Sequence, residues 1–232
     1  MSGITLTDHL LDKQDSFEMV RDQIALIIKC NIDYQKTLAA AASPYQDPAA
    51  YDLRVFIERA NPFEEFLNDP DTSAPIVNIW YDSQSFDRRT GNVSRQQQGT
   101  AIFNIDVYAK GVSECTREGH APGDKDAALE AQRAAKLVRN IIMADINTYL
   151  QLPRGKDAGG YFGGRWIDSI QSFQPEIDSR PAQHVQGMRI ALSTSFVEFA
   201  PQQTNETLDI IHTTVKRKET GEVYFEVQED FS

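Results

Sequence analysis

A glycine-rich stretch at residues 154–166, RGKDAGGYFGGRW, is the part of the sequence that comes nearest to a nucleotide-binding motif. Five glycines fall within ten positions, and a Gly155-Lys156 pair lies among them. A phosphate-binding loop leads from a strand into a helix, because the helix N-terminus supplies N–H donors and the positive end of the dipole. Here a predicted helix precedes the glycines and a strand follows them, and Asp157 stands where the motif has Ser or Thr. We therefore interpret the stretch as a flexible hinge and expect no nucleotide cofactor.

Two aromatic residues, Tyr161 and Phe162, lie between the glycine pairs of this stretch. Glycine adopts positive φ at no steric cost, so the backbone on either side of the two rings is conformationally free. Large apolar side chains on such a backbone suit a loop that becomes ordered against another protein. We predict that Tyr161 and Phe162 are docking residues.

Other residue types that could perform chemistry are scattered. The sequence has no Cys-x-x-Cys or His-x-x-x-His pair that would indicate a zinc site. It also lacks the Gly-x-Ser-x-Gly pattern of a serine nucleophile. The two cysteines, Cys30 and Cys115, lie in unlike contexts and are expected to be free thiols. The sequence thus predicts no catalytic residues, no metal and no cofactor, and a protein that is not an enzyme.

The charge balance points away from nucleic-acid binding. The chain carries 34 acidic against 23 basic residues, a net charge of −11, which repels a phosphate backbone. No apolar run approaches the ~20 residues that span a bilayer, and the N-terminus lacks the features of a signal peptide. The expectation is a protein made in the cytoplasm, without a membrane partner.

One locally basic island interrupts this acidic sequence. Arg88, Arg89 and Arg95 lie in the polar segment 82–99, which we predict to be a long loop without regular structure. No aromatic residue is interleaved with the arginines, so bases would have no stacking partner. Guanidinium groups pair well with carboxylates, and we therefore predict that this loop docks on an adjoining protein. A solvated flexible loop is the alternative, because exposed arginines are common.

The elements that must position these residues can be assigned from apolar spacing and turn signals. A helix is predicted over 15–42, with Asp15 as its cap and Glu18 in the reciprocal position. A second helix is predicted over 124–149, with an apolar stripe that ends at Ile146 and Tyr149. Strands are predicted at 51–59, 75–81, 101–110, 165–173 and 186–199, with residues 111–123 as a loop.

The strand at 101–110 shows the clearest two-faced pattern: Phe103, Ile105 and Val107 alternate with Asn104 and Asp106. Consecutive strands joined by loops favour an antiparallel or mixed sheet. The predicted class is α+β, with a mixed, mostly antiparallel sheet covered by two long helices. Residues 1–204 would form a single domain.

Residues 205–232 are predicted to form an appended β-hairpin arm around the turn sequence KETGE. The segments LDIIHTTV and EVYFEV both alternate, so each offers an apolar face. Because a two-stranded hairpin is marginally stable in water, this face needs a surface to rest on. We predict that the arm leaves its own subunit and packs on a neighbouring subunit or on another adjoining protein, by adding strands to an exposed sheet edge, with Tyr224 and Phe225 as docking residues.

The order of segments resembles that of the tail terminator proteins of tailed bacteriophages. A long first helix and three strands ending in AIFNIDVYAKG lead to an alanine-rich helix, ALEAQRAAKLVRNIIMADIN. RWIDSIQSFQPEI and VQGMRIALSTSFVEF then complete the sheet. The resemblance covers most of residues 15–200 and rests on architecture, not on an invariant motif. It implies a small α+β protein without catalytic residues, whose rings, usually of six subunits, cap the finished tail tube.

The resemblance also implies a set of partners and a place in the virion. The partners would be other copies of the chain in a homohexameric ring, the tail tube protein, a head–tail connector or neck protein, and a sheath protein. DNA would pass through the acidic ring without specific binding, and the alternative explanation of the acidic charge is ordinary solubility. Another neck, connector or baseplate component is an alternative within the same class. A hydrolase or nucleotide-binding enzyme is the alternative from a different class.

Overall fold

The computed structural model describes residues 15–68, 73–87, 96–111, 114–116, 119–121, 123–152, 160–175, 184–199, 210–216 and 223–230. The chain divides into two compact units. One is the body, Lys13–Ala200, and the other combines Met1–Asp12 with Pro201–Ser232.

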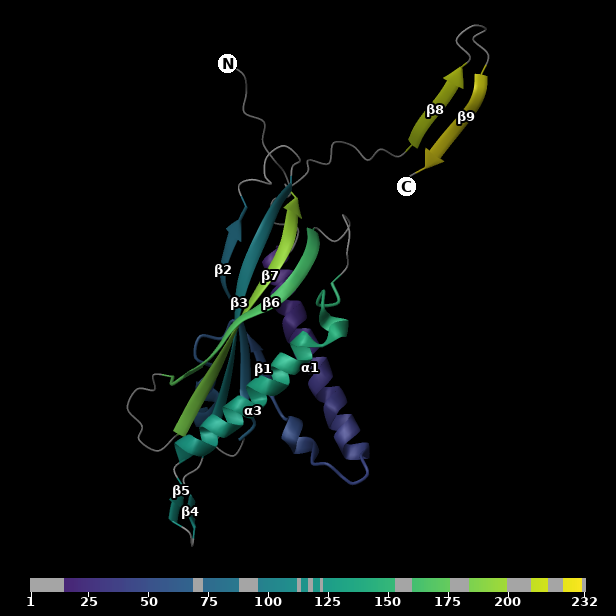
Figure 1. The fold of residues 1–232 in the computed structure, drawn as a ribbon. Helices are drawn as coiled ribbons and strands as arrows, with labels where there is room; N and C mark the ends of the chain where they lie inside the picture. The colour runs from purple at the N-terminus through teal and green to yellow at the C-terminus, as the bar shows by residue number, and fades with distance from the viewer. Residues whose placement is uncertain are drawn as a thin grey trace, which may run out of the picture. The chain divides into compact units, whose positions relative to one another are not determined.

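The body is built on a five-stranded mixed sheet (Figure 1). Its strands, in spatial order, are β1 (Arg54–Ile57), β2 (Ile76–Phe86), β3 (Gln96–Gly111), β7 (His184–Phe199) and β6 (Gly160–Phe173). β1 pairs with β2 in parallel, and the other neighbours pair antiparallel. The prediction of a mixed α/β protein with a mixed sheet is therefore confirmed.

The main core lies where α1 (Ser16–Ala41) and α3 (Gly123–Met143) pack on the sheet. The Glu18 side chain accepts a hydrogen bond of 3.0 Å from the backbone N–H of Asp15, the reciprocal half of the predicted capping box. β2, β3 and β7 contribute alternate residues to this core, including Phe103, Ile105 and Val107 of β3. The predicted apolar face of β3 is thus the buried one.

The opposite face of the sheet carries a second, smaller cluster at one end. Ile76 and Tyr108 alternate with core residues along β2 and β3, so they point to this second face. Phe66 of the short α2 (Glu65–Asn68) covers them, and Phe63 of the 3₁₀ turn η2 (Pro62–Glu64) packs alongside. Part of the segment between the predicted strands at 51–59 and 75–81 therefore packs over this second face.

The predicted loop at 82–99 includes residues that belong to strands. β2 continues to Phe86 and β3 begins at Gln96, so only the middle of that segment lies outside the described strands. Phe86 pairs with Gly99, whose missing side chain leaves room for the rings of Phe86 and Phe196. The predicted loop at 111–123 also contains two short strands, β4 (Glu114–Thr116) and β5 (Gly119–Ala121), which pair antiparallel.

The second helix ends earlier than predicted, at Met143. The Arg165 guanidinium donates to the carbonyl oxygens of Ile142, at 2.6 Å, and Ala144, at 2.9 Å, and so satisfies acceptors that a continuing helix would use. Ile146 lies in a separate 3₁₀ turn, η3 (Asp145–Asn147), and is 77% exposed, so it is not part of the core stripe. A cap supplied by a residue far along the chain leaves no local sequence signal.

The C-terminal unit contains β8 (Ile210–Lys216) and β9 (Val223–Asp230), which pair antiparallel. Val215 stands opposite Phe225, and Thr213 stands opposite Val227.

Candidate functional site

The second face of the sheet carries a row of polar residues that crosses three strands. Asn78 of β2 stands opposite Asp106 of β3, and Asp106 stands opposite Arg189 of β7. Each follows from the alternation of its strand, because the neighbouring positions point into the main core. The antiparallel register therefore gathers polar groups that are far apart in the sequence.

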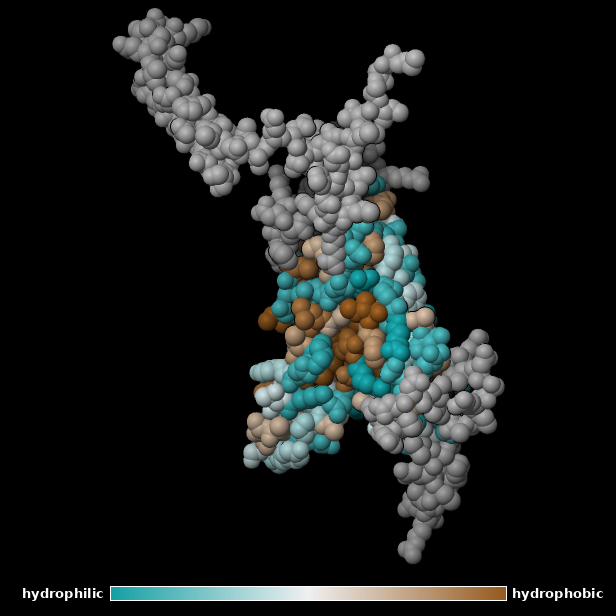
Figure 2. All heavy atoms as spheres, turned by 180° about the vertical axis from the view of Figure 1, so that it is seen from behind, coloured by the Kyte–Doolittle hydropathy of each residue, from teal (hydrophilic) through white to brown (hydrophobic). Residues whose placement is uncertain are grey.

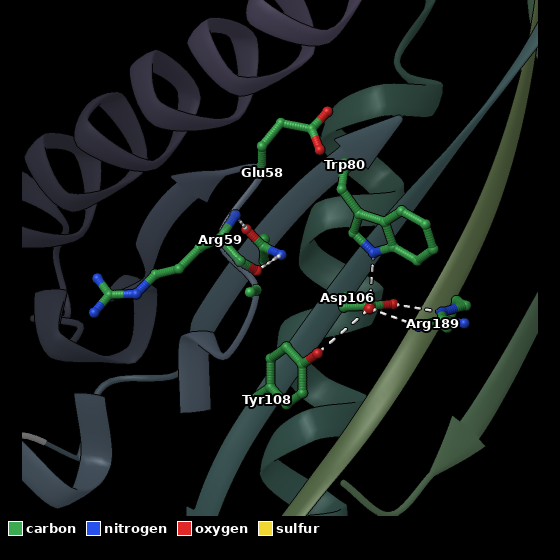
Figure 3. Close-up of a pocket in the computed structure, with 8 residues that line it drawn as sticks. Glu58, Arg59, Trp80, Asp106, Tyr108 and Arg189 are labelled. Carbon is green, nitrogen blue, oxygen red and sulfur yellow. Dashed lines mark hydrogen bonds and ion pairs between the residues drawn. The ribbon is translucent and has the colours of Figure 1, made fainter. Parts of the chain in front are cut away.

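Asp106 lies at the centre of this row and accepts hydrogen bonds from three side chains (Figure 3). Arg189 contacts it in a bidentate pair, Nε to Oδ1 at 2.7 Å and Nη2 to Oδ2 at 2.8 Å. The Trp80 indole N–H donates to Oδ2 at 2.9 Å, and the Tyr108 hydroxyl donates to the same oxygen at 3.4 Å. The Asp106 side chain is only 3% exposed, so these contacts replace the water that a buried carboxylate would otherwise require.

Arg189 also packs against aromatic rings. Its Cζ lies 5.0 Å from the centre of the Trp80 ring and 5.2 Å from that of Phe173. Phe173 fits here because Gly187 has no side chain, and a Cβ at that position would come within 2.5 Å of the ring. The guanidinium is thus held by one carboxylate and two rings, although its side chain is 39% exposed.

A pocket of about 290 Å³ opens beside this cluster. Its lining consists of Glu58, Arg59, Ala60, Asn78, Trp80, Asp106, Tyr108 and Arg189. Burial, and then the neighbouring Asp106 carboxylate, raise the pKa of Tyr108 well above its ordinary value. The hydrogen bond to Asp106 raises the pKa of Arg189. Both side chains therefore keep their protons at any physiological pH.

The wall of the pocket at the end of β1 is fixed by side chains that act as backbone partners. The Asn78 amide accepts from the N–H of Arg59 at 3.1 Å and donates to its carbonyl oxygen at 2.9 Å. Glu58 has φ of 51° and accepts from the N–H of Tyr81 at 2.9 Å. The Arg59 side chain points away from Asp106 (Figure 3) and pairs with Glu65. Beyond the last strand pair of β1 and β2, hydrogen bonds from side chains to the backbone therefore hold the two segments together.

This geometry suits recognition more than acid–base chemistry. Both oxygens of Asp106 already accept hydrogen bonds, and Tyr108 and Arg189 do not titrate near neutral pH. No group of three or more metal-ligating side chains gathers among the described residues. What the pocket presents includes the partly exposed Trp80 ring and the Arg189 guanidinium.

Apolar side chains also gather on the surface of the molecule. The view in Figure 2 shows a face with apolar residues in its middle and polar residues around them. Exposed large apolar side chains occur on α1, on η3 and on β6, among other places. They are Leu26, Tyr34, Leu38, Tyr45, Ile57, Phe86, Leu129, Met143, Ile146, Tyr149, Trp166 and Ile170.

Among the predicted docking residues, only Phe162 has a side chain that the structure describes. Arg88, Arg89 and Arg95 lie outside the described residues. Tyr161 and Phe162 lie in β6, which begins at Gly160, so the later part of the glycine stretch is strand and not hinge. Phe162 is 7% exposed and belongs to the main core, so its ring packs within its own chain.

The remaining predicted docking residues, Tyr224 and Phe225, lie in β9.

The cluster around Asp106 was not predicted, although a signal for it existed. Asp106 is a carboxylate in the middle of an apolar strand, and a charge there demands a cationic partner on an adjoining strand. Arg189 was the basic residue available in the last long strand, but its register could not be deduced from sequence alone.

Two comparisons with known proteins were without a match. A scan against models of known protein families gives no match, and a search of curated protein sequences gives none either. Within the described residues, no helix combines the length and apolar character that a membrane crossing requires.

Proposed function

We propose that this chain is a structural virion protein of the tail terminator type, which forms a ring on the end of a finished tail tube and provides a docking surface for the head. A sheet covered by two long helices, with an appended hairpin, is the arrangement that this proposal requires. The ring would be a homohexamer in the virion neck, and its contacts would be with the tube protein, a sheath protein and a connector or neck protein.

The observation that carries the proposal is an exposed stripe along α1. Leu26, Cys30, Tyr34 and Leu38 follow one another at intervals of four residues, which places them on one face of the helix. All four are exposed, whereas Ile24, Ile28 and Ile32 on the same helix are buried in the core. A helix that is apolar on two faces needs a partner for the outer one, and a neighbouring subunit supplies it.

A ring of identical subunits joins two different surfaces of the chain, one on each side of every subunit. The α1 stripe is one candidate surface, and the exposed residues of β6 lie on a different element. The negative net charge supports the same proposal, because an acidic lumen lets DNA slide without adhering.

Native mass spectrometry of the purified chain and of the neck released from virions tests this proposal. We expect six copies per particle and a ring in negative-stain micrographs. Antibody label should fall at the junction of head and tail. A single copy per particle, or label at the baseplate, would contradict the terminator role.

The α1 stripe can be tested separately by the substitution Tyr34→Lys. Because Tyr34 is exposed, the melting temperature should stay close to that of the wild type. The yield of the ring should fall, since a lysine in an apolar contact must be desolvated. Leu129→Lys, on the exposed side of α3, is the matched control and should leave both quantities unchanged.

A further inference from the structure

The outer edge of β6 is the longest unpaired strand edge of the body among the described residues. β6 is the last strand of the sheet and runs from Gly160 to Phe173, with β7 as its partner on one side. Alternate N–H and C=O groups of an edge strand point away from the sheet and are available to another strand. No described side chain donates to or accepts from the β6 backbone on that side.

The other edge of the sheet is covered along its first part, where β1 pairs with residues 76–79 of β2. β1 has only four residues, and beyond it the Glu58 carboxylate takes the N–H of Tyr81. Short edge strands and side chains that occupy edge N–H groups both discourage the addition of a further strand. The part of β2 that continues past Tyr81 to Phe86 is shorter than β6, and strand addition therefore favours β6.

Two irregularities divide β6 into three segments, of which the last is the longest. The register with β7 shifts between Phe162 and Gly164 and again between Ile167 and Ser169. From Ser169 to Phe173 the register is unbroken. Bulges interrupt pairing, so the longest regular ladder can extend along this last segment, whose length matches an ordinary strand.

The chemistry of residues 169–173, SIQSF, suits an uncharged partner strand. Ile170 is 40% exposed and can cover an apolar side chain on an added strand. Asp168 stands just before the segment and is exposed, so an acidic partner would be repelled. The required partner is a strand without carboxylates that carries β-branched residues.

The same chain contains such a strand. β8, with the sequence IIHTTVK, has no acidic residue and consists largely of β-branched residues. β9, its partner in the hairpin, carries Glu226, Glu229 and Asp230. If β8 pairs with β6, β9 becomes the new outer strand, and its charges prevent any further strand from adding.

We propose that β8 of a second copy of this chain adds to residues 169–173 of β6, so that each subunit donates its hairpin to the next. This inference rests on the proposed ring, because a donor strand and an acceptor edge on one chain produce a head-to-tail interface. Residues 200–209 separate β7 from β8 in the sequence, and ten residues can span at most about 35 Å when fully extended.

Photo-crosslinking of the full-length chain tests the pairing. A photoreactive phenylalanine analogue replaces Gln171, which is exposed on β6, in an equal mixture of light and heavy isotope-labelled chains. We expect crosslinked peptides that join Gln171's position to residues 210–216 and carry one light and one heavy partner. Crosslinks to the hairpin with like isotopes only would show docking within one chain and would overturn the proposal. Crosslinks that miss the hairpin would overturn it as well.

Ile170→Lys gives the matched perturbation, with Leu129→Lys as control because both positions are exposed and apolar. Ile170→Lys should reduce the mixed-isotope crosslink roughly fivefold or more, through loss of an apolar cross-strand pair, with an unchanged melting temperature. Electron microscopy separates this inference from the ring itself. Rings that persist after deletion of residues 205–232 would contradict strand donation and leave the terminator role standing. Mixed-isotope crosslinks without any ring would support strand donation and contradict the terminator role.

Discussion

Asp106 of β3 and Arg189 of β7 face each other across the sheet in a bidentate ion pair, with the carboxylate buried and the guanidinium at the surface. The pair joins the adjacent strands β3 and β7 on the side away from the main core. Its partners Trp80 and Phe173 come from β2 and β6, so four of the five strands meet at this point.

Loss of the guanidinium should destabilise the body. Arg189→Met leaves the Asp106 carboxylate buried without its cation, and we expect a cost of about 3 kcal/mol in the free energy of unfolding. Urea unfolding monitored by circular dichroism measures this. The double variant Asp106→Asn with Arg189→Met should recover part of the loss, because no charge is then left unpaired. Equal stability of Arg189→Met and the wild type would show that water replaces the guanidinium.

Tyr108 should make the body sensitive to alkaline pH. Its folded pKa is raised above the ordinary value of 10.0, so the stability that it contributes is complete below pH 10 and is lost as the pH rises further. The unfolding free energy should therefore fall above pH 10 more steeply in the wild type than in Tyr108→Phe. The variant should cost less than about 1 kcal/mol at neutral pH, since the hydroxyl bond to Asp106 is long at 3.4 Å. Identical pH profiles would argue against a buried phenol.

Gly187 should not tolerate a side chain. The added methyl group of Gly187→Ala would come within 2.5 Å of the Phe173 ring, and we expect a loss of about 1 to 3 kcal/mol in thermal or urea unfolding. Combining it with Phe173→Leu should cost less than the sum of the two single changes, because the smaller side chain vacates the space. Additive losses would mean that the ring and the glycine are independent.

The predicted docking loop gives a test at the level of the particle. Reversal of Arg88 and Arg89 to Glu should leave the melting temperature unchanged and block tail completion or head joining, because carboxylates on an adjoining protein would then be repelled. Electron microscopy of lysates would show free heads with overlong or unjoined tails. Normal virions from the double variant would exclude the loop as a docking element.

The sequence was sufficient for those parts of the fold that depend on local periodicity. The capping box at Asp15 and the two-faced pattern of β3 are properties of neighbouring residues, and both were predicted. The end of α3 was not, because Arg165 supplies the cap from another strand. The same holds for the site, since Asp106 and Arg189 become partners only through the strand register.

The long ladder between β3 and β7 has a consequence for folding during synthesis. Gln96 pairs with Phe199, so one backbone edge of β3 has no partner strand until about a hundred more residues have been synthesised. Contacts of such sequence separation close slowly, and a nascent strand without a partner invites pairing with other chains. Asp106 then has no counter-charge, and a carboxylate in the middle of an open strand disfavours wrong partners. We expect Asp106 to disfavour pairing of the nascent β3 with other chains until Arg189 has been synthesised and can form the ion pair.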